Sequence, residues 1–249
     1  MKVKEPTYAE LLAMPGVIEQ SDLRGSFGFM AYHGGALEET TDVIARQAAS
    51  RCGASYYGVL QPESLQLHFP SITVTPDGSE LLRSFLEHVD TVVTIHGFHR
   101  VTMRTSILLG GRNRELAAHI ARHLRTAMPS YEVVDNLTKI PVELQGLHER
   151  NPVNVPAHAG VQIELPPRAR GVGTFWADHK GDALVPHTRS LIDGLVAAVG
   201  EWTGVRGRAR SASPTIDGGR ARSASPTIDG GIARSASPTI DGVSESSAE

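Results

Sequence analysis

Along the first 200 residues, segments whose hydrophobic residues have the period of a strand alternate with segments whose hydrophobic residues have the period of a helix. Short runs of β-branched or alternating apolar residues predict strands. These runs lie at residues 26–33, 56–60, 67–74, 91–96, 105–110, 131–134 and 160–165. The run TVVTIH at 91–96 is almost continuously β-branched, as expected for a strand that is buried on both faces.

Apolar residues spaced three and four apart predict helices between these strands. The helices are expected at residues 38–51, 79–88, 114–128 and 188–203. Ser79 is suited to cap the second of them, and Gly53 to end the first. Strands that alternate with helices are typical of a mainly parallel sheet with helices on its faces. The stretch 136–159 fits neither period, and such a long irregular segment often forms a binding loop.

The pattern ends near residue 205. From Ala209 onward the segment ARSASPTIDGG occurs three times with a period of 12 residues, the last copy ending in Val243. Each copy offers one isoleucine and no aromatic residue, too little apolar surface to offset the entropy of ordering the chain. We therefore predict a folded domain over residues 1–204 and a disordered tail over 205–249.

Composition excludes several classes of protein. The net charge of −3 gives no general basic field for nucleic acid or anionic lipid, so we expect neither as a partner. The single cysteine, Cys52, excludes an intrachain disulfide and is expected to be a small core residue. No signal peptide and no run of about 18 apolar residues is evident. We expect a cytoplasmic, monomeric protein that does not bind membranes.

Polar residues stand at the ends of three predicted strands. His33 ends the first strand, His96 ends the TVVTIH strand, and Glu164 lies near the end of the last. Ligands of open α/β sheets bind beyond the carboxyl ends of the strands, so these side chains are expected to converge. Gly34 and Gly35 permit a sharp turn after His33, which would bring Glu38 close from the first turn of the next helix.

His33, Glu38 and His96 together offer two imidazoles and one carboxylate. This is the ligand set of a catalytic zinc site that keeps its fourth position open for water. Zn²⁺ lowers the pKa of bound water toward about 7, and a nearby carboxylate must then carry the proton. We predict a zinc site of these three ligands, with Glu164 as the general base.

Other interpretations of these residues are available. Histidines at strand ends are often hydrogen-bonded turn residues, and a glutamate at a helix start interacts with the helix dipole. His99 is a rival ligand, and His68 is a candidate for lining the cleft. His119 and His123 have the spacing of a zinc-protease helix, but Ile120 occupies the position of the general base. We interpret that pair as part of a solvated helix face.

The chain resembles the poly-γ-glutamate hydrolase family, which is structurally related to the zinc carboxypeptidases. The resemblance covers roughly residues 5–200. It is carried by YHGGALEETTDVIA at 32–45, TVVTIHGF at 91–98, LLGGRNREL at 108–116, and the blocks NPVN and AHAGVQIELPPRAR between 151 and 170. It implies a mixed, mostly parallel, open twisted α/β sheet flanked by helices. By the resemblance, His33, Glu38 and His96 match the zinc ligands, and Glu164 matches the base.

The resemblance also implies an acidic amide or γ-glutamyl polymer as substrate, which would suit arginines that hold carboxylates bidentately. Arg170 is the first choice and Arg112 the second; Asn154 could donate to a substrate carbonyl. The other arginines near strand ends are Arg100, Arg104 and Arg168. Two further hypotheses stay open: a zinc carboxypeptidase or small-molecule deacylase on the same scaffold, and a binding module without catalysis.

Overall fold

The computed structural model describes residues 6–173 and 184–211, with side chains up to residue 202. Helices and strands follow one another in the order α1 (Tyr8–Leu12), β1 (Ile18–Asp22), β2 (Gly25–Gly35), α2 (Thr41–Cys52), β3 (Ala54–Gln61), α3 (Glu80–His88), β4 (Thr91–Gly97), β5 (Ser106–Leu109), α4 (Arg114–Ala127), β6 (Glu132–Val134), β7 (Gly160–Leu165), α5 (Pro167–Arg170) and α6 (Pro186–Ser211). Short 3₁₀ turns lie in the connections, three of them within the irregular stretch 136–159.

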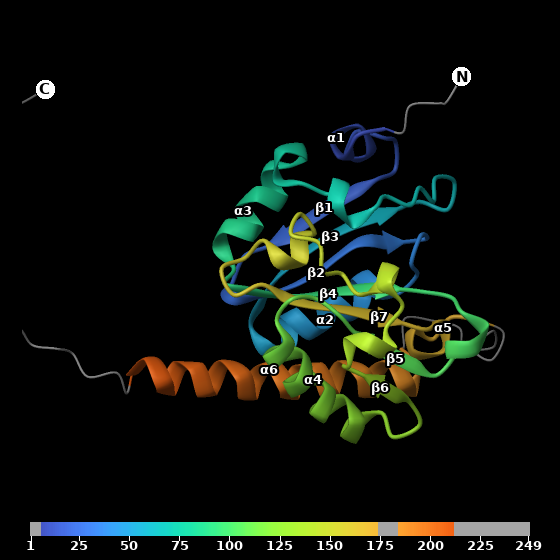
Figure 1. Cartoon of the computed structure of the whole chain (residues 1–249). Helices are drawn as coiled ribbons and strands as arrows, with labels where there is room; N and C mark the ends of the chain where they lie inside the picture. Colours follow the sequence, from blue (N-terminus) through green and yellow to red (C-terminus); the bar gives the residue numbers. More distant parts are fainter. Residues whose placement is uncertain (1–5, 174–183, 212–249) are drawn as a thin grey trace, which may run out of the picture. The chain divides into compact units, whose positions relative to one another are not determined.

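The strands form one seven-stranded sheet in the order β1-β3-β2-β4-β7-β5-β6 (Figure 1). The four central strands, β3, β2, β4 and β7, are parallel. β1 pairs antiparallel with β3, and β5 pairs antiparallel with β7 while β6 runs parallel to β5. The prediction of a mixed, mostly parallel sheet flanked by helices is confirmed.

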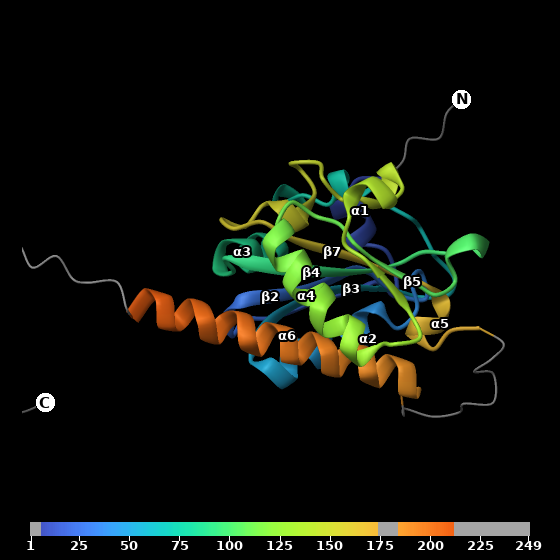
Figure 2. The same cartoon turned by 60° about the horizontal axis from the view of Figure 1, so that its bottom comes forward.

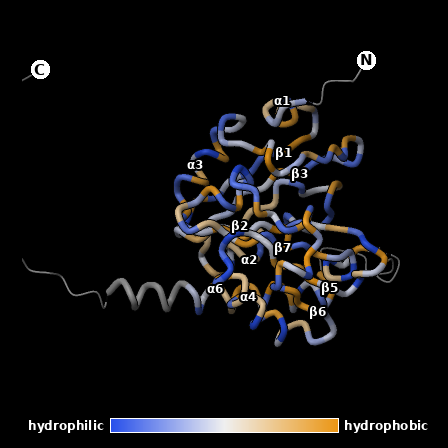
Figure 3. Tube along the Cα trace, in the orientation of Figure 1, coloured by the Kyte–Doolittle hydropathy of each residue, from blue (hydrophilic) through white to orange (hydrophobic). Residues whose placement is uncertain are grey.

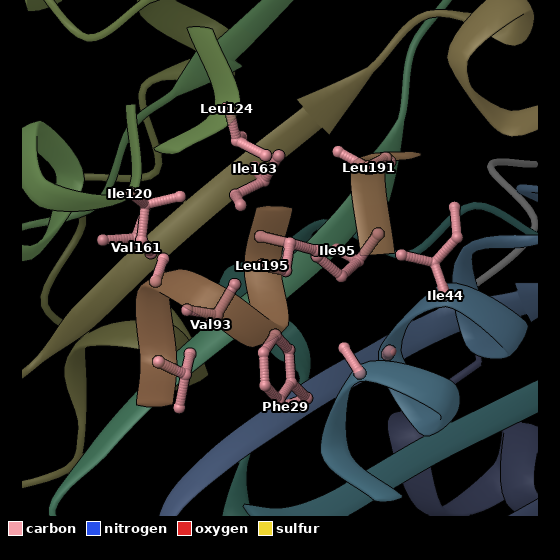
Figure 4. Packing of buried hydrophobic residues seen from close by; sticks show 14 of the residues in the cluster. Phe29, Ile44, Val93, Ile95, Ile120, Leu124, Val161, Ile163, Leu191 and Leu195 are labelled. Atoms are coloured by element: carbon pink, nitrogen blue, oxygen red, sulfur yellow. The ribbon is translucent and has the colours of Figure 1, made fainter. Parts of the chain in front are cut away.

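Helices α2, α4 and α6 cover one face of the sheet (Figure 2). Alternate residues of the central strands, such as Phe29, Val93 and Ile163, point to these helices and are fully buried. Figure 4 shows them meeting Ile44 of α2, Leu124 of α4 and apolar residues of α6. The cysteine at the end of α2 packs beside this core, as predicted.

Helices α1 and α3 cover the opposite face. Met30 of β2, Tyr57 of β3 and Val92 of β4 point to this side and pack against Leu82 and Phe85 of α3. Hydrophobic stretches follow the strands inside the sheet, and hydrophilic ones follow the outer connections (Figure 3). As predicted, Ser79 caps α3, because its hydroxyl accepts from the backbone N–H of Leu82 at 3.0 Å.

The predicted strand at Leu67–Val74 is wrong. The segment is a connection that contains a 3₁₀ turn at Ser71–Thr73. The side chain of Gln61 donates to the carbonyl of Leu67 and accepts from its N–H, which satisfies groups that a neighbouring strand would otherwise bond. The helix α1 and the edge strand β1 were not predicted; β1 has the polar sequence IEQSD and no buried residue.

Two helix boundaries differ from the prediction. Helix α2 begins at Thr41, not at Glu38, because Thr40 has a left-handed backbone with φ of 74°. Helix α6 continues beyond the predicted end at residue 203 to Ser211, so the boundary at 204/205 falls inside it. The rest of the predicted tail, 212–249, lies outside the described residues. Among the described helices, none combines the length and apolar character that crossing a membrane requires.

Candidate metal centre

A β-bulge in strand β2 sets the direction of His33. Ala31 lies opposite Gly58 of β3 and Gly34 lies opposite Leu60, so β2 has one extra residue between them. Such a bulge interrupts the strict alternation of side chains. Tyr32 and His33, adjacent in sequence, therefore both approach His96 of β4: the ring centroids lie 4.8 and 5.0 Å from that imidazole.

A tight turn after β2 carries Glu38. The backbone N–H of Glu38 donates to the carbonyl of His33 at 2.9 Å, and the Thr41 hydroxyl donates to the carbonyl of Glu38 at 2.7 Å. Gly35 has φ of 68°, and a Cβ there would stand 2.4 Å from the carbonyl oxygen of Gln61. The Gly-Gly corner was thus predicted correctly, but it delivers Glu38 from the turn itself.

His33, Glu38 and His96 meet in one cluster, here called the strand-end cluster. Their potential ligand atoms all lie within 4.8 Å of one another, and all three side chains are buried. Glu38 Oε1 is 2.9 Å from His33 Nδ1, and Oε2 is 3.3 Å from His96 Nδ1. Glu38 Oε2 also accepts from the backbone N–H of Gly97 at 2.9 Å.

The outer nitrogens of both rings are already engaged. His33 Nε2 lies 2.9 Å from the carbonyl oxygen of Phe69, which can only accept, so Nε2 carries the proton. His96 Nε2 lies 2.9 Å from the hydroxyl of Tyr32. Metal-binding histidines commonly hold the second ring nitrogen in this way. The Nδ1 atoms contact the Glu38 carboxylate. A cation would take the place of these contacts, and the donor set fits Zn²⁺.

The charges of the strand-end cluster depend on one another. Burial acts to raise the pKa of the Glu38 carboxyl, but His33 and His96 together lower that pKa well below its ordinary value. Burial acts to lower the pKa of His96, while the Glu38 carboxylate raises it more strongly. The Glu38 carboxylate is an anion buried between two imidazole rings, and a divalent cation at this position would stabilise its negative charge.

Glu164 lies beside this cluster on strand β7, directly opposite His96 in the parallel register. Gln162 donates to Glu164 Oε1 at 2.8 Å, and Asn151 in turn donates to Gln162 Oε1 at 2.8 Å. Burial is the main cause that raises the pKa of Glu164 to about 7, with Glu38 adding to the effect. A carboxyl with this pKa can both take and give a proton near neutral pH.

All four residues line one cavity of about 730 Å³. The segment 142–148 of the irregular stretch also lines the cavity, and the expectation that it binds a ligand stays a prediction. His68 is an exposed residue that lines the cavity, and its ring centroid lies 4.7 Å from that of His33. The expectation that His68 lines the cleft is confirmed.

The predicted substrate-binding residues lie elsewhere. Arg170 is buried, donates to the carbonyl of Glu39 at 2.7 Å, and packs under Gly97, where a Cβ would stand 2.7 Å from Cζ of Arg170. Asn154 accepts from the backbone N–H of the exposed Arg112 at 3.0 Å. None of the three lines the cavity. Their roles toward substrate stay predictions.

The other arginines and the rival histidine also have different surroundings. Arg100 pairs with Glu143, and Arg168 lies 5.9 Å from the ring centroid of Tyr131. His99 is exposed and is not among the residues lining the cavity. It is therefore placed apart from the strand-end cluster.

His119 and His123 do not lie on a freely solvated face, so that interpretation is wrong. Both rings are half-buried on the side of α4 that faces α6. His119 Nε2 lies 2.8 Å from the carbonyl oxygen of Ala198 in α6. The hydrophobic spacing of α4 did not indicate this contact, because α6 contributes it from a distant part of the chain.

Tyr32, Gln162 and Asn151 were not predicted as site residues. Gln162 could have been found, since it stands two residues before Glu164 and therefore on the same face of the strand. Tyr32 could not, because ordinary alternation directs neighbouring residues to opposite faces and the bulge is not visible in the sequence. Asn151 lies in the irregular stretch, where spacing gives no direction.

Comparison with known proteins identifies relatives. The family model of poly-γ-glutamate hydrolase matches residues 8–180. The structure of a bacteriophage poly-γ-glutamate hydrolase aligns with a TM-score of 0.65 and 20% identity, covering 81% of this chain and 98% of that one. A zinc-free apo structure of YNDL aligns with a TM-score of 0.56 and 18% identity, covering 76% and 89%.

No sequence among curated proteins matches the chain significantly. The two structural alignments, at or below 20% identity, establish a shared fold. The family match spans well over half of the 249 residues and includes every residue of the strand-end cluster and Glu164. The chain therefore belongs to the poly-γ-glutamate hydrolase family.

Proposed function

We propose that the protein is a zinc-dependent hydrolase that cleaves γ-glutamyl amide bonds, with Glu164 as general base. The observation that carries the proposal is the convergence of His33, Glu38 and His96 within 4.8 Å, beside a buried carboxyl in the same cavity. Two imidazoles and a carboxylate with one open position are the ligand set of zinc hydrolases.

Each residue has a definite task in this proposal. A zinc ion held by His33, Glu38 and His96 would supply Lewis-acid polarisation of water and of the amide carbonyl. Glu164 takes a proton from the attacking water and returns it to the leaving amine. The raised pKa of Glu164, about 7, suits both transfers at neutral pH. Gln162 holds the carboxyl by donating to Oε1 at 2.8 Å.

Membership of the family supports a γ-glutamyl substrate, and the zinc-free form in which YNDL was solved supports zinc as the metal. The cavity of about 730 Å³ has room for a short segment of a polymer chain. We expect a monomer whose partner is an acidic γ-glutamyl polymer, with no nucleic acid and no membrane involved.

One observation favours a second candidate, a zinc carboxypeptidase or deacylase of small amides. The described residues that line the cavity include no lysine or arginine, whereas Glu38, Glu143 and Glu164 are among them. An anionic polymer would gain little from this lining away from the metal. A substrate with a neutral or apolar group beside the scissile bond would fit Ile72, Leu144 and Leu147.

A substrate panel separates the two candidates. Purified protein without a histidine tag is loaded with one equivalent of Zn²⁺ and incubated with poly-γ-glutamate, γ-glutamyl dipeptides and N-acyl amino acids. Shortening of the polymer, followed by gel filtration, supports the first candidate. Cleavage confined to the small amides supports the second. If no substrate is cleaved and the zinc-loaded protein is folded, the hydrolytic proposal is wrong.

A further inference from the structure

A second group of histidines and a carboxylate lies where α4 packs against α6. His119 and His123 stand one turn apart on α4, with their ring centroids 4.9 Å from each other. Glu201 reaches them from α6. The potential ligand atoms of these three residues lie within 4.8 Å of one another. We call His119, His123 and Glu201 the helix cluster.

From this arrangement we propose that the helix cluster is a second metal site, which binds a divalent transition metal such as Zn²⁺ and clamps α4 to α6. Residues four apart share one helix face, so both imidazoles are presented to the same point. Imidazole and carboxylate donors favour Zn²⁺, Cu²⁺, Ni²⁺ or Co²⁺ over Mg²⁺ and Ca²⁺.

The tautomer of His119 suits metal binding. Its Nε2 lies 2.8 Å from the carbonyl oxygen of Ala198, which can only accept, so the proton is on Nε2. Nδ1 is left with its lone pair. A ligand histidine whose other nitrogen donates to a backbone carbonyl is the usual second-sphere arrangement of metal sites. The same hydrogen bond joins α4 to α6 and fixes the ring.

His123 and Glu201 approach each other without forming a hydrogen bond. His123 Nε2 is shielded from solvent and lies 2.9 Å from Glu201 Oε2, yet the geometry gives that nitrogen no hydrogen-bond partner. A shielded polar nitrogen that stays unsatisfied is unfavourable. A cation between the nitrogen and the carboxylate would satisfy both. A hollow of about 330 Å³ beside them has room for water ligands.

Arg122 opposes the cation. Its Nη2 donates to His119 Nδ1 at 2.6 Å and lies 3.9 Å from Glu201 Oε1. The Arg122 side chain is mostly exposed, so it can rotate into solvent when a metal binds. Its charge nevertheless repels the metal. The helix cluster is therefore expected to bind metal more weakly than the strand-end cluster, whose imidazoles accept no hydrogen bond from a guanidinium of the described residues.

The test counts metal ions in the full-length, untagged protein. Equilibrium dialysis against buffered Zn²⁺, followed by elemental analysis, should give two ions per chain. The double variant H119Q/H123Q should bind one, and so should H33A, which keeps the helix cluster. The control H88Q/H158Q removes two exposed histidines outside both clusters and should still bind two. Dialysis against Mg²⁺ should give no ion at the helix cluster.

A second variant tests the effect of Arg122 on the zinc affinity of the helix cluster. Arg122→Ala removes the opposing charge and should tighten zinc binding at the helix cluster by about 30-fold, as expected for a unit charge and a divalent ion on the order of 4 Å apart in water. Zinc should also raise the Tm of H33A, and this rise should disappear when Glu201→Gln is added. Circular dichroism of each metal-free variant verifies that it is folded.

The two metal proposals fail separately. If the wild type and H119Q/H123Q bind the same number of zinc ions, the helix cluster is not a metal site, whatever the activity. If H33A and the wild type bind the same number while H119Q/H123Q binds one fewer, the strand-end cluster is refuted and the helix cluster stands. Unchanged zinc affinity in Arg122→Ala would also contradict the geometry described.

Discussion

The strand-end cluster and the helix cluster contain the same groups, two imidazoles and one carboxylate, in very different surroundings. The side chains of His33, Glu38 and His96 are at most 9% exposed. In the helix cluster the side chain of Glu201 is 49% exposed and that of His123 21%. The same three kinds of donor are thus almost fully buried in the strand-end cluster and partly exposed to solvent in the helix cluster.

The way the clusters are built differs as well. The buried one takes its groups from a bulged strand, a turn and a second strand, and the Phe69 carbonyl and the Tyr32 hydroxyl hold its outer nitrogens. The other needs only a helix repeat and one neighbouring helix. A buried charge without a partner is unfavourable because it has lost its hydration. The buried carboxylate between the two rings therefore requires a positive charge beside it. We infer that the stability of the strand-end cluster depends strongly on a bound metal, and that the stability of the helix cluster depends on it weakly.

The largest effect is expected from His96→Ala. It should remove the zinc ion from the strand-end cluster and reduce hydrolysis by at least about 10³-fold, because the group that polarises the substrate is lost. Elemental analysis and an amide hydrolysis assay measure both. His99→Ala, an exposed histidine three residues away, is the matched control and should change neither. Full activity in His96→Ala would exclude the strand-end cluster as the catalytic centre.

Glu164→Gln tests the proposed general base without changing a proposed metal ligand. The amide keeps the size of the side chain and can still accept from Gln162, but it cannot carry a proton. We expect kcat to fall about 10²- to 10⁴-fold, the usual range for a positioned general base. Zinc content should stay at the wild-type value. If the variant keeps its kcat, the proton moves by another route.

Tyr32→Phe removes the hydroxyl that contacts His96 in the strand-end cluster. His96 Nε2 then loses its partner at 2.9 Å and the ring is held less firmly. Zinc affinity, measured against a competing chelator, should fall about 10- to 100-fold. Tyr8→Phe is the control, because its hydroxyl, 2.6 Å from that of Tyr57, lies on the same face of the sheet but outside the cluster. Equal affinities in the two variants would show that the contact does not orient His96.

The sequence predicted those parts of the site that follow strand periodicity. Strands 91–96 and 160–165 were placed within a residue of their bounds, and both direct the polar residue at their ends, His96 and Glu164, into the cavity. Their regular alternation, together with the rule that strand ends form the site, is sufficient for this. The Gly-Gly corner was recognisable because few other residues adopt a φ of 68° without strain.

The remaining parts depend on departures from periodicity or on distant contacts. The bulge at Tyr32 and His33 comes from unequal residue numbers in two paired strands, which a single segment cannot reveal. Glu38 looks like a helix residue until the left-handed backbone of Thr40 delays the helix. The position of Arg170 under Gly97 of β4 likewise depends on a distant contact that its own segment does not reveal. Glu201 joins His119 and His123 only through the packing of α4 on α6.

The last prediction concerns stability and separates the two environments directly. The folded-state pKa of Glu164 is about 7, well above the ordinary value of 4.5, so the metal-free folded protein binds this proton more tightly than the unfolded chain. Stability therefore falls as pH rises from about 4.5 to about 7, and the penalty is fully present above that range. Glutamine has no charge to bury.

Metal-free Glu164→Gln should therefore exceed the wild type in free energy of unfolding at pH 8 by up to about 3 kcal/mol, the equivalent of a pKa difference of about 2.5. At pH 4 the two proteins should agree, because Glu164 is then protonated in both states. Urea denaturation in the presence of a chelator measures both values. Glu201→Gln, at an exposed position, should stay within about 0.5 kcal/mol of the wild type at either pH. A stabilisation of Glu164→Gln that is the same at pH 4 and pH 8 would mean that packing, and not the buried charge, distinguishes the two carboxylates.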